Sequence, residues 1–308
     1  MNIKRFLFLS AVVGLLLTSC GEDTAFEENP FYDEEATGED PKIPAGGLND
    51  TLGGSGGSGG NGSASTLVVD QIQRATVTYI GATWCPPCGA NGDPAKIYME
   101  DTYGDNVVIL NVQYRDAISP RGSFGFNFGT KFQDFVGSNS IPHAYWSGSN
   151  FNMKNRGFYN DANANNSESQ IDIDAILRNI PEVGVAAKAS LSNGVVSVET
   201  KTKFFNSLNQ AYLGVYLLED AVMAMQKVGT KDSLTSHENV MRASAFNSDT
   251  LGIDLIGTSL AADDELVGNY QITVPGSVVD PTNLQVAVVV WESDQVNGIA
   301  NSIIVDVE

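Results

Sequence analysis

The stretch ATVTYIGATWCPPC, residues 75–88, decides the fold. Its first six residues are largely β-branched and predict a strand that ends at Gly81, and the residues after Asp93 can form a helix. Two cysteines between a strand and a helix are typical of a redox dithiol. At the helix N-terminus, Cys85 faces unpaired amides and the positive end of the helix dipole, which favour its thiolate. Cys88, one turn further in, is placed to resolve a mixed disulfide.

The cysteine pair has two alternatives to a redox role, an inert disulfide and a zinc site. An inert structural disulfide is the main alternative, because Cys85 and Cys88 would oxidise in an exported protein in any case. A zinc site would need two further ligands, and only His143 and His237 are present, at unsuitable spacing. We therefore predict a redox-competent pair, no metal site and no cofactor.

The pattern of apolar residues changes at Pro181. Residues 67–181 alternate strands and helices, an order typical of an α/β domain, with strands expected at 75–80, 107–112 and 141–146 and helices at 124–136 and 171–180. From Val183 onward the period is two, and Asn193-Gly194 suits a type I′ hairpin turn. Residues 182–308 are therefore expected to form an all-β sandwich, with further strands near 211–219, 238–246, 267–275, 284–292 and 300–307.

The N-terminal residues read as an export signal. Lys4 and Arg5 precede a short apolar run at 6–17, which is shorter than the ~20 residues that span a bilayer. The run ends at Leu-Thr-Ser-Cys20-Gly, which resembles the lipobox of bacterial lipoproteins and implies lipidation of Cys20 after cleavage of residues 1–19. The alternative is a plain signal peptide with an incidental cysteine.

Charge and composition limit the partners. The 308-residue chain has a net charge of −20, which repels phosphate backbones, so we expect no nucleic-acid partner. Residues 20–66 run from an acidic stretch into a Gly/Ser-rich repeat at 53–60. Such a segment buries too little apolar area to fold, so it is predicted to be a disordered tether.

Trp84-Cys85-Pro86-Pro87-Cys88, together with Ile141-Pro142 downstream, resembles the thioredoxin superfamily. The resemblance implies that Pro142 is cis and lies against the disulfide. It also implies that Trp84, Ile141 and Pro142 bind the substrate, with Ile141 contacting the substrate backbone. It covers about residues 67–180. One position departs from the family pattern, because the strand residue that is acidic in thioredoxin is Tyr79 here. The resemblance then implies that Cys88 lacks a helper for its deprotonation.

The order of segments also resembles the 28-kilodalton outer membrane protein family of lipoproteins. The similar segments are Tyr216–Asp220, His237–Ala243 and Leu284–Trp291. This family joins a thioredoxin-like domain to a C-terminal β-domain. The expected fold class is thus an α/β thioredoxin-like domain (67–181) followed by an all-β sandwich domain (182–308).

Together these features predict a membrane-anchored thiol–disulfide oxidoreductase of the cell envelope. Cys85 attacks, Cys88 resolves, and the expected partners are exported proteins with disulfides and a membrane electron donor. The lipid on Cys20 is expected to hold the chain on the outer membrane, with the periplasmic or surface face left open. The alternative function is a surface binding or adhesion lipoprotein in which the thioredoxin-like domain is a scaffold.

Overall fold

The computed structural model describes residues 65–159, 161–246 and 250–308. The predicted signal peptide (1–19), Cys20 and all but the last two residues of the predicted tether (20–66) lie outside the described residues. Among the described residues there are 14 strands and three α-helices. Residues 62–308 make up one compact unit. Within the described part, no helix is both long and apolar enough to cross a bilayer.

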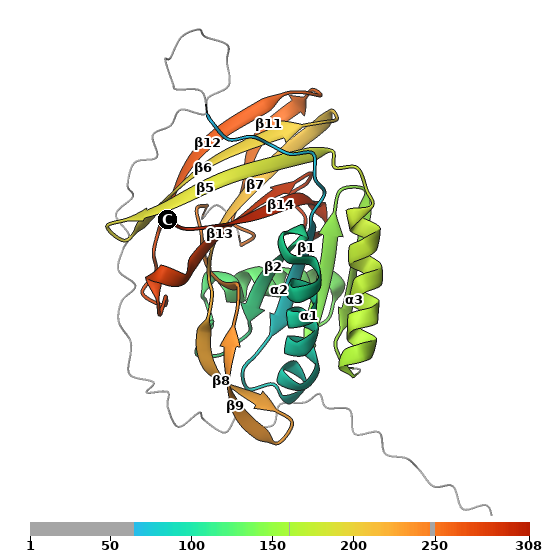
Figure 1. Cartoon of the computed structure of the whole chain (residues 1–308), viewed down its shortest axis with the longest axis vertical. Coiled ribbons are helices and arrows are strands. Elements are labelled where there is room, and N and C mark those ends of the chain that lie inside the picture. Colours follow the sequence, from blue (N-terminus) through green and yellow to red (C-terminus); the bar gives the residue numbers. More distant parts are fainter. Residues whose placement is uncertain (1–64, 160, 247–249) are drawn as a thin grey trace, which may run out of the picture. The chain divides into compact units, whose positions relative to one another are not determined.

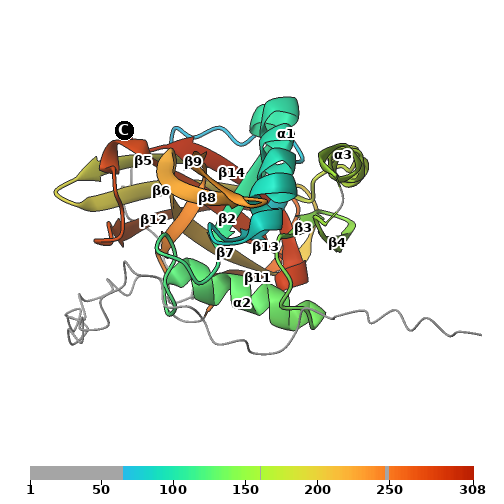
Figure 2. The same cartoon turned by 90° about the horizontal axis from the view of Figure 1, so that it is seen from below.

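The first half of the described chain places helices on both faces of a sheet. Strand β1 pairs in parallel with β2 and antiparallel with β3, which in turn pairs with β4. Helices α1 and α3 lie on one side of these strands and α2 on the other (Figure 2). These elements are β1 (Ala75–Gly81), α1 (Asp93–Tyr103), β2 (Val107–Gln113), α2 (Phe124–Val136), β3 (His143–Gly148), β4 (Phe151–Gly157) and α3 (Ala162–Leu177).

The described residues of the second half form strands and short 3-10 turns. Asn193 and Gly194 have φ angles of 51° and 75° and close the β5–β6 hairpin, as their sequence predicts. The strands are β5 (Val183–Ser192), β6 (Val195–Phe204), β7 (Leu208–Glu219), β8 (Val222–Val228), β9 (Lys231–His237), β10 (Val240–Ser244), β11 (Ile253–Leu260), β12 (Glu265–Thr273), β13 (Leu284–Trp291) and β14 (Ile299–Asp306).

One nine-stranded sheet runs through both halves (Figure 1). Its order is β14-β13-β7-β10-β2-β1-β3-β4, with β11 paired to the side of β7. The halves join where Val240 of β10 pairs with Asn111 of β2, and the Asn111 side chain donates to the Glu238 carbonyl at 2.7 Å. Beneath α2, a single core cluster includes Leu110 of β2 and Leu218 of β7. The central sheet and its core are therefore shared by the two halves.

A smaller sheet covers part of the large one. Strands β12, β6 and β5 form this three-stranded sheet. Its inner side chains share a core cluster with the large sheet, in which Val198 of β6 joins Val215 of β7 and Val288 of β13. This part of the molecule is a layer of sheet on sheet, as expected for apolar residues that alternate along strands.

The predicted fold class is wrong. We expected an α/β thioredoxin-like domain followed by an all-β sandwich domain, whereas the structure is mostly β, with strands of both segments in one sheet. The physical reason is the pairing of β10 with β2, because it continues the first segment's sheet into β7, β13 and β14. In detail, α3 spans Ala162–Leu177 rather than 171–180, and β4, β8, β9 and β11 were not predicted.

Candidate dithiol site

Cys85 and Cys88 form a disulfide at the start of a helix. Their Cα atoms are 5.2 Å apart, and helical turns begin at Pro86, directly after Cys85. The backbone amide of Cys88 donates to Cys85 Sγ at 3.2 Å. This places the first sulfur against the N-terminal end of the helix, where unpaired amides stabilise negative charge.

The helix begins with a π-helical turn at Cys88–Gly92, in which the Asp93 amide bonds to the Cys88 carbonyl. This turn changes which residue of the helix lies on the same face as Cys88. In an α-helix, a residue five positions on is rotated by about 140° at 3.6 residues per turn. The wider π turn brings Asp93 closer to the side that carries Cys88. Such turns are frequent at functional sites.

The segment before β3 lies against the disulfide. The Ile141–Pro142 peptide bond is cis, and the Ile141 carbonyl oxygen is 3.9 Å from Cys85 Sγ. Gly92 packs against the proline ring, because a Cβ at Gly92 would lie 2.7 Å from Pro142 Cβ. Four of the predicted site residues are thus brought together: Cys85, Cys88, Ile141 and Pro142.

Trp84, the remaining predicted site residue, stands at the surface beside the cysteines. It is 45% exposed, and its indole N–H donates to the Arg115 carbonyl at 3.2 Å. By contrast, Cys85 is only 3% exposed and Cys88 only 1%. The tryptophan is therefore open to a partner molecule while the disulfide is covered.

The β8–β9 hairpin, which the sequence did not reveal, packs on the turn that carries the cysteines. Its Gln226 amide nitrogen lies 3.2 Å from the Ala82 carbonyl oxygen and 3.3 Å from that of Cys85. The Lys227 amide donates to the Thr83 carbonyl at 2.7 Å. Gln226 and Lys227 thus bind the turn that carries the cysteines. No local motif predicts such a contact, since about 140 residues separate its partners.

A buried group of ionisable side chains lies behind the same turn. The Tyr79 hydroxyl donates to Asp93 Oδ1 at 3.2 Å. Burial raises the pKa of the Asp93 carboxyl, while Lys96 and the bond from Tyr79 act to lower it. Burial, followed by the charge of Asp93, raises the pKa of Tyr79 well above its ordinary value. Tyr79 was expected to leave this strand position without an acid, and the structure places the acid Asp93 of α1 beside the Tyr79 hydroxyl.

Both histidines are buried and have polar partners. His143 Nε2 lies 3.1 Å from Asn155 Oδ1, and burial lowers the His143 pKa. His237 Nδ1 lies 3.4 Å from Gln113 Nε2, and burial lowers the His237 pKa to about 4. No group of three or more His, Cys, Asp or Glu side chains in the described part is arranged to hold a metal ion.

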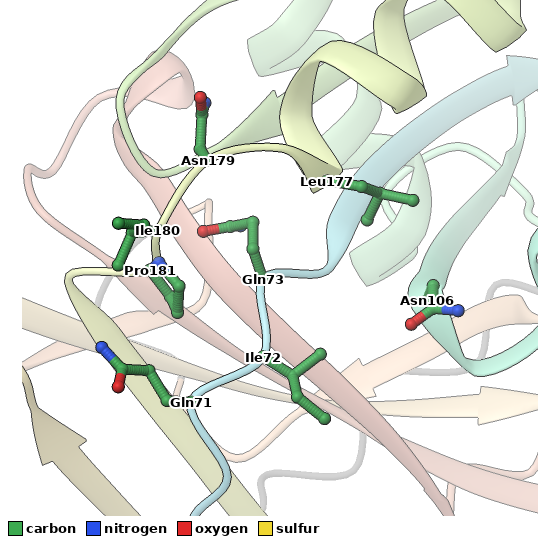
Figure 3. A pocket seen from close by; sticks show the side chains of 8 residues that line it. All are labelled: Gln71, Ile72, Gln73, Asn106, Leu177, Asn179, Ile180 and Pro181. Atoms are coloured by element: carbon green, nitrogen blue, oxygen red, sulfur yellow. The ribbon is translucent and has the colours of Figure 1, made fainter.

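A shallow groove of about 660 Å³ lies elsewhere, where the chain enters β1 and leaves α3 (Figure 3). Its lining is apolar or uncharged and contains neither cysteine, so the groove and the dithiol are separate features. The lining residues are Gln71, Ile72, Gln73, Asn106, Leu177, Asn179, Ile180 and Pro181.

The fold and the site define a mostly β protein that carries a disulfide at the start of a helix, beside a cis proline. HBP35 of Porphyromonas gingivalis is similar in structure, with a TM-score of 0.60 and 15% identity over 77% of this chain and 76% of that one. At this identity the likeness shows a shared fold. A domain of the outer membrane lipoprotein Omp28 from Porphyromonas gingivalis aligns over 42% of this chain and 91% of its own length. Its TM-score is 0.28 at 17% identity, which carries no argument. No protein-family model and no characterised protein matches the sequence.

Proposed function

We propose that the protein is a membrane-anchored thiol–disulfide oxidoreductase that acts on exported proteins through Cys85 and Cys88. The observation that carries the proposal is the setting of the Cys85 sulfur. It lies 3.2 Å from the Cys88 amide and 3.9 Å from the Ile141 carbonyl. The amide stabilises a thiolate at Cys85, and the Ile141–Pro142 segment offers backbone for contact with a substrate strand.

The reaction needs only the two sulfurs and the substrate disulfide. The Cys85 thiolate attacks one substrate sulfur, and the other substrate sulfur leaves as a thiolate. Cys88 then attacks the Cys85 sulfur and releases the second substrate sulfur. The substrate gains two electrons and two protons, and the Cys85–Cys88 disulfide forms again. A membrane electron donor with its own dithiol would return the pair to the reduced state.

The proposed location rests on the N-terminal sequence. The export signal and Cys20 support a lipid anchor that holds the mature chain on the outer membrane within the cell envelope. Replacement of this cysteine, Cys20→Ser, should abolish incorporation of labelled fatty acid and release the chain from membranes. Continued labelling of the variant would refute the anchor.

Covalent trapping tests the activity. In the full chain, Cys88→Ser removes the resolving thiol, so mixed disulfides between Cys85 and substrate proteins should accumulate and disappear on reduction. Cys85→Ser is the matched control, because it keeps one thiol at the same turn but removes the attacking one. We expect exported cysteine-containing proteins to be trapped by the first variant and not by the second.

One observation favours a second function. Because Cys85 and Cys88 are 3% and 1% exposed, the disulfide has the burial of an inert staple, which suits a surface binding or adhesion lipoprotein. The same trapping experiment separates the two functions. Absence of mixed disulfides from Cys88→Ser, with the variant folded, would favour binding over oxidoreduction.

A further inference from the structure

The inner face of the β8–β9 hairpin is fixed to the cysteine turn by backbone and buried side chain. Lys227 donates its amide to the Thr83 carbonyl at 2.7 Å. Gln226, which is 1% exposed, directs its amide nitrogen at the carbonyl oxygens of Ala82 and Cys85. This contact joins residues that are remote in sequence, and it is made directly at the first cysteine.

Gly89 allows the hairpin to approach so closely. A Cβ at this position would lie 2.5 Å from the Lys227 carbonyl oxygen and 2.9 Å from Val228 Cγ2. Gly89 directly follows Cys88, so the hairpin also touches the turn on the side of the second cysteine. The hairpin is thus packed on both ends of the Cys85–Cys88 segment.

Burial of the sulfurs conflicts with exchange chemistry. Thiol–disulfide exchange requires a third sulfur to reach one sulfur of the disulfide, and its rate depends on access. With Cys85 at 3% exposure, part of the cover has to move before a partner sulfur arrives. By contrast, Ile141 packs against the core beneath α2, and the helix that begins at Pro86 continues into α1, whose Ala95 and Met99 pack on β1.

The hairpin should open at a lower free energy than those segments. Within the described residues, β8 and β9 form a two-stranded sheet of their own, and such hairpins are marginally stable in isolation. Its outward face is exposed, with Met223 at 55%, Met225 at 56% and Leu234 at 62%. Gln226 Oε1 is buried without a hydrogen-bond partner, which weakens the closed state. Elements with few buried apolar contacts open at the lowest free energy.

We propose that the β8–β9 hairpin is a gate over the Cys85–Cys88 pair and that Gln226 is its latch. The hairpin projects beside the end of α1 that follows the cysteines (Figure 1). Closed, it holds the cysteine turn through Gln226 and Lys227. Open, it uncovers Cys85 for attack or for reduction. The gate rests on the proposed function for its purpose and regulates that same site, although its movement can be measured without any protein substrate.

The rate of disulfide reduction by a small phosphine measures how often the gate opens. The full chain with Cys20→Ser contains Cys85 and Cys88 as its only cysteines, so the thiols released report this disulfide alone. Phosphorus attacks one sulfur, the S–S bond breaks, and water converts the adduct to phosphine oxide and two thiols. With a gate, the reduction rate should level off as the phosphine concentration rises, because opening becomes limiting.

Two variants loosen the contact from opposite sides. Gln226→Ala removes the latch and should raise the reduction rate at low phosphine about tenfold, the effect of losing one or two buried hydrogen bonds. Gly89→Ala should act in the same direction by pushing the Lys227 carbonyl away. Met225→Ala is the matched control, since it shortens an exposed side chain on the outward face of the same strand. We expect it to change the rate less than twofold.

Hydrogen exchange of the Lys227 amide provides a second readout. Its acceptor is Thr83, across the gate, so exchange should accelerate by a similar factor in Gln226→Ala. A wild-type rate that rises linearly with phosphine, together with an unchanged rate in folded Gln226→Ala, would overturn the gate. Equal acceleration in Met225→Ala would overturn the latch. A gate that behaves as expected while Cys88→Ser traps no protein would contradict the oxidoreductase function alone.

Discussion

Pro86 and Pro87 remove two backbone donors from the turn that faces the Cys85 sulfur, because proline has no N–H. The Cys88 amide, 3.2 Å from Cys85 Sγ, is the donor that remains at the turn. The thiolate is therefore stabilised less than in dithiols with free amides at both positions, and the reduced form is not favoured. We expect a reducing pair, with a potential nearer ~−270 mV than the ~−120 mV of a strong oxidant.

Equilibration of the purified chain with glutathione buffers measures this potential, and the fluorescence of Trp84 beside the pair is a suitable signal. Pro87→Ala restores one amide, so its potential should rise by roughly 30 mV or more, which corresponds to about 1.4 kcal/mol for two electrons. A wild-type potential above about −180 mV would contradict the reductase and favour an oxidase or isomerase. An unchanged potential in Pro87→Ala would contradict the role given to the proline.

His237 should make stability depend on pH. Burial lowers the pKa of His237 to about 4 in the folded chain, against an ordinary value of 6.5. The unfolded chain thus binds more protons between these values, so the stability present above pH 6.5 is lost as the pH falls toward 4. The full loss is about 3 kcal/mol. In denaturant unfolding at several pH values, His237→Gln should show a weaker decline over this window. The same decline in both chains would refute the assignment.

At the scale of elements, helix α2 packs against strands of both halves of the chain. Phe128 is fully buried, and its ring centroid lies 5.5 Å from that of Tyr216 in β7. Phe128→Ala should therefore lower the free energy of unfolding by about 3–5 kcal/mol. Phe135, on the same helix, is 47% exposed, and Phe135→Ala should cost under about 1 kcal/mol. Comparable losses for the two variants, measured by urea unfolding, would mean that α2 is not anchored through Phe128.

Elements with a strong internal period were predictable. Helix α2 spans Phe124–Val136, as its phenylalanine spacing indicates, and the β5–β6 hairpin turns at Asn193-Gly194. The β8–β9 hairpin was not predictable in this way. Its exposed face carries Met223, Met225 and Leu234, whereas its inner face carries the buried Gln226. Apolar residues lie on both faces of the hairpin, since Val222 on the inner face is only 4% exposed, so no alternation of apolar and polar residues marks a core.

The residues of the candidate site likewise divide into those that were predictable from the sequence and those that were not. The cysteines were named from a local motif and the Ile141–Pro142 segment from the family resemblance, and the structure places them together. Gln226 and Asp93 were missed for different reasons. Gln226 reaches the turn through a contact between distant parts of the chain, and Asp93 depends on a π-helical turn that its α-helical spacing does not indicate. Their roles in the reaction stay predictions.

At the scale of the whole molecule, the joint between the halves contains buried polar contacts as well as the apolar core beneath α2. Arg242 of β10 bonds to Glu219 of β7 at 2.7 Å and also donates to the carbonyl of Ile118, which precedes α2. Both charged side chains are almost fully buried. A period-two pattern shows that β10 is a strand but does not show which neighbour it pairs with. The strands were therefore predictable here, whereas the pairing that joins them to the sheet of the first half was not.

A shared sheet and core should make the halves unfold together. Trp146 in β3 and Trp291 in β13 are both fully buried, one in each half. We compare two variants, each of which keeps one of these tryptophans and has the other tryptophans replaced by phenylalanine. Circular dichroism of each variant gives the shift in urea midpoint that the replacements themselves cause. After correction for that shift, the fluorescence of the two variants should give the same midpoint. Two-state unfolding predicts coincident curves from both probes in each sample.

Residues 182–308 expressed alone should lack a cooperative transition, because they would expose the apolar face that α2 covers in the intact chain. Separate midpoints for the two tryptophans, or a cooperative fragment, would show that the halves fold independently despite their common sheet.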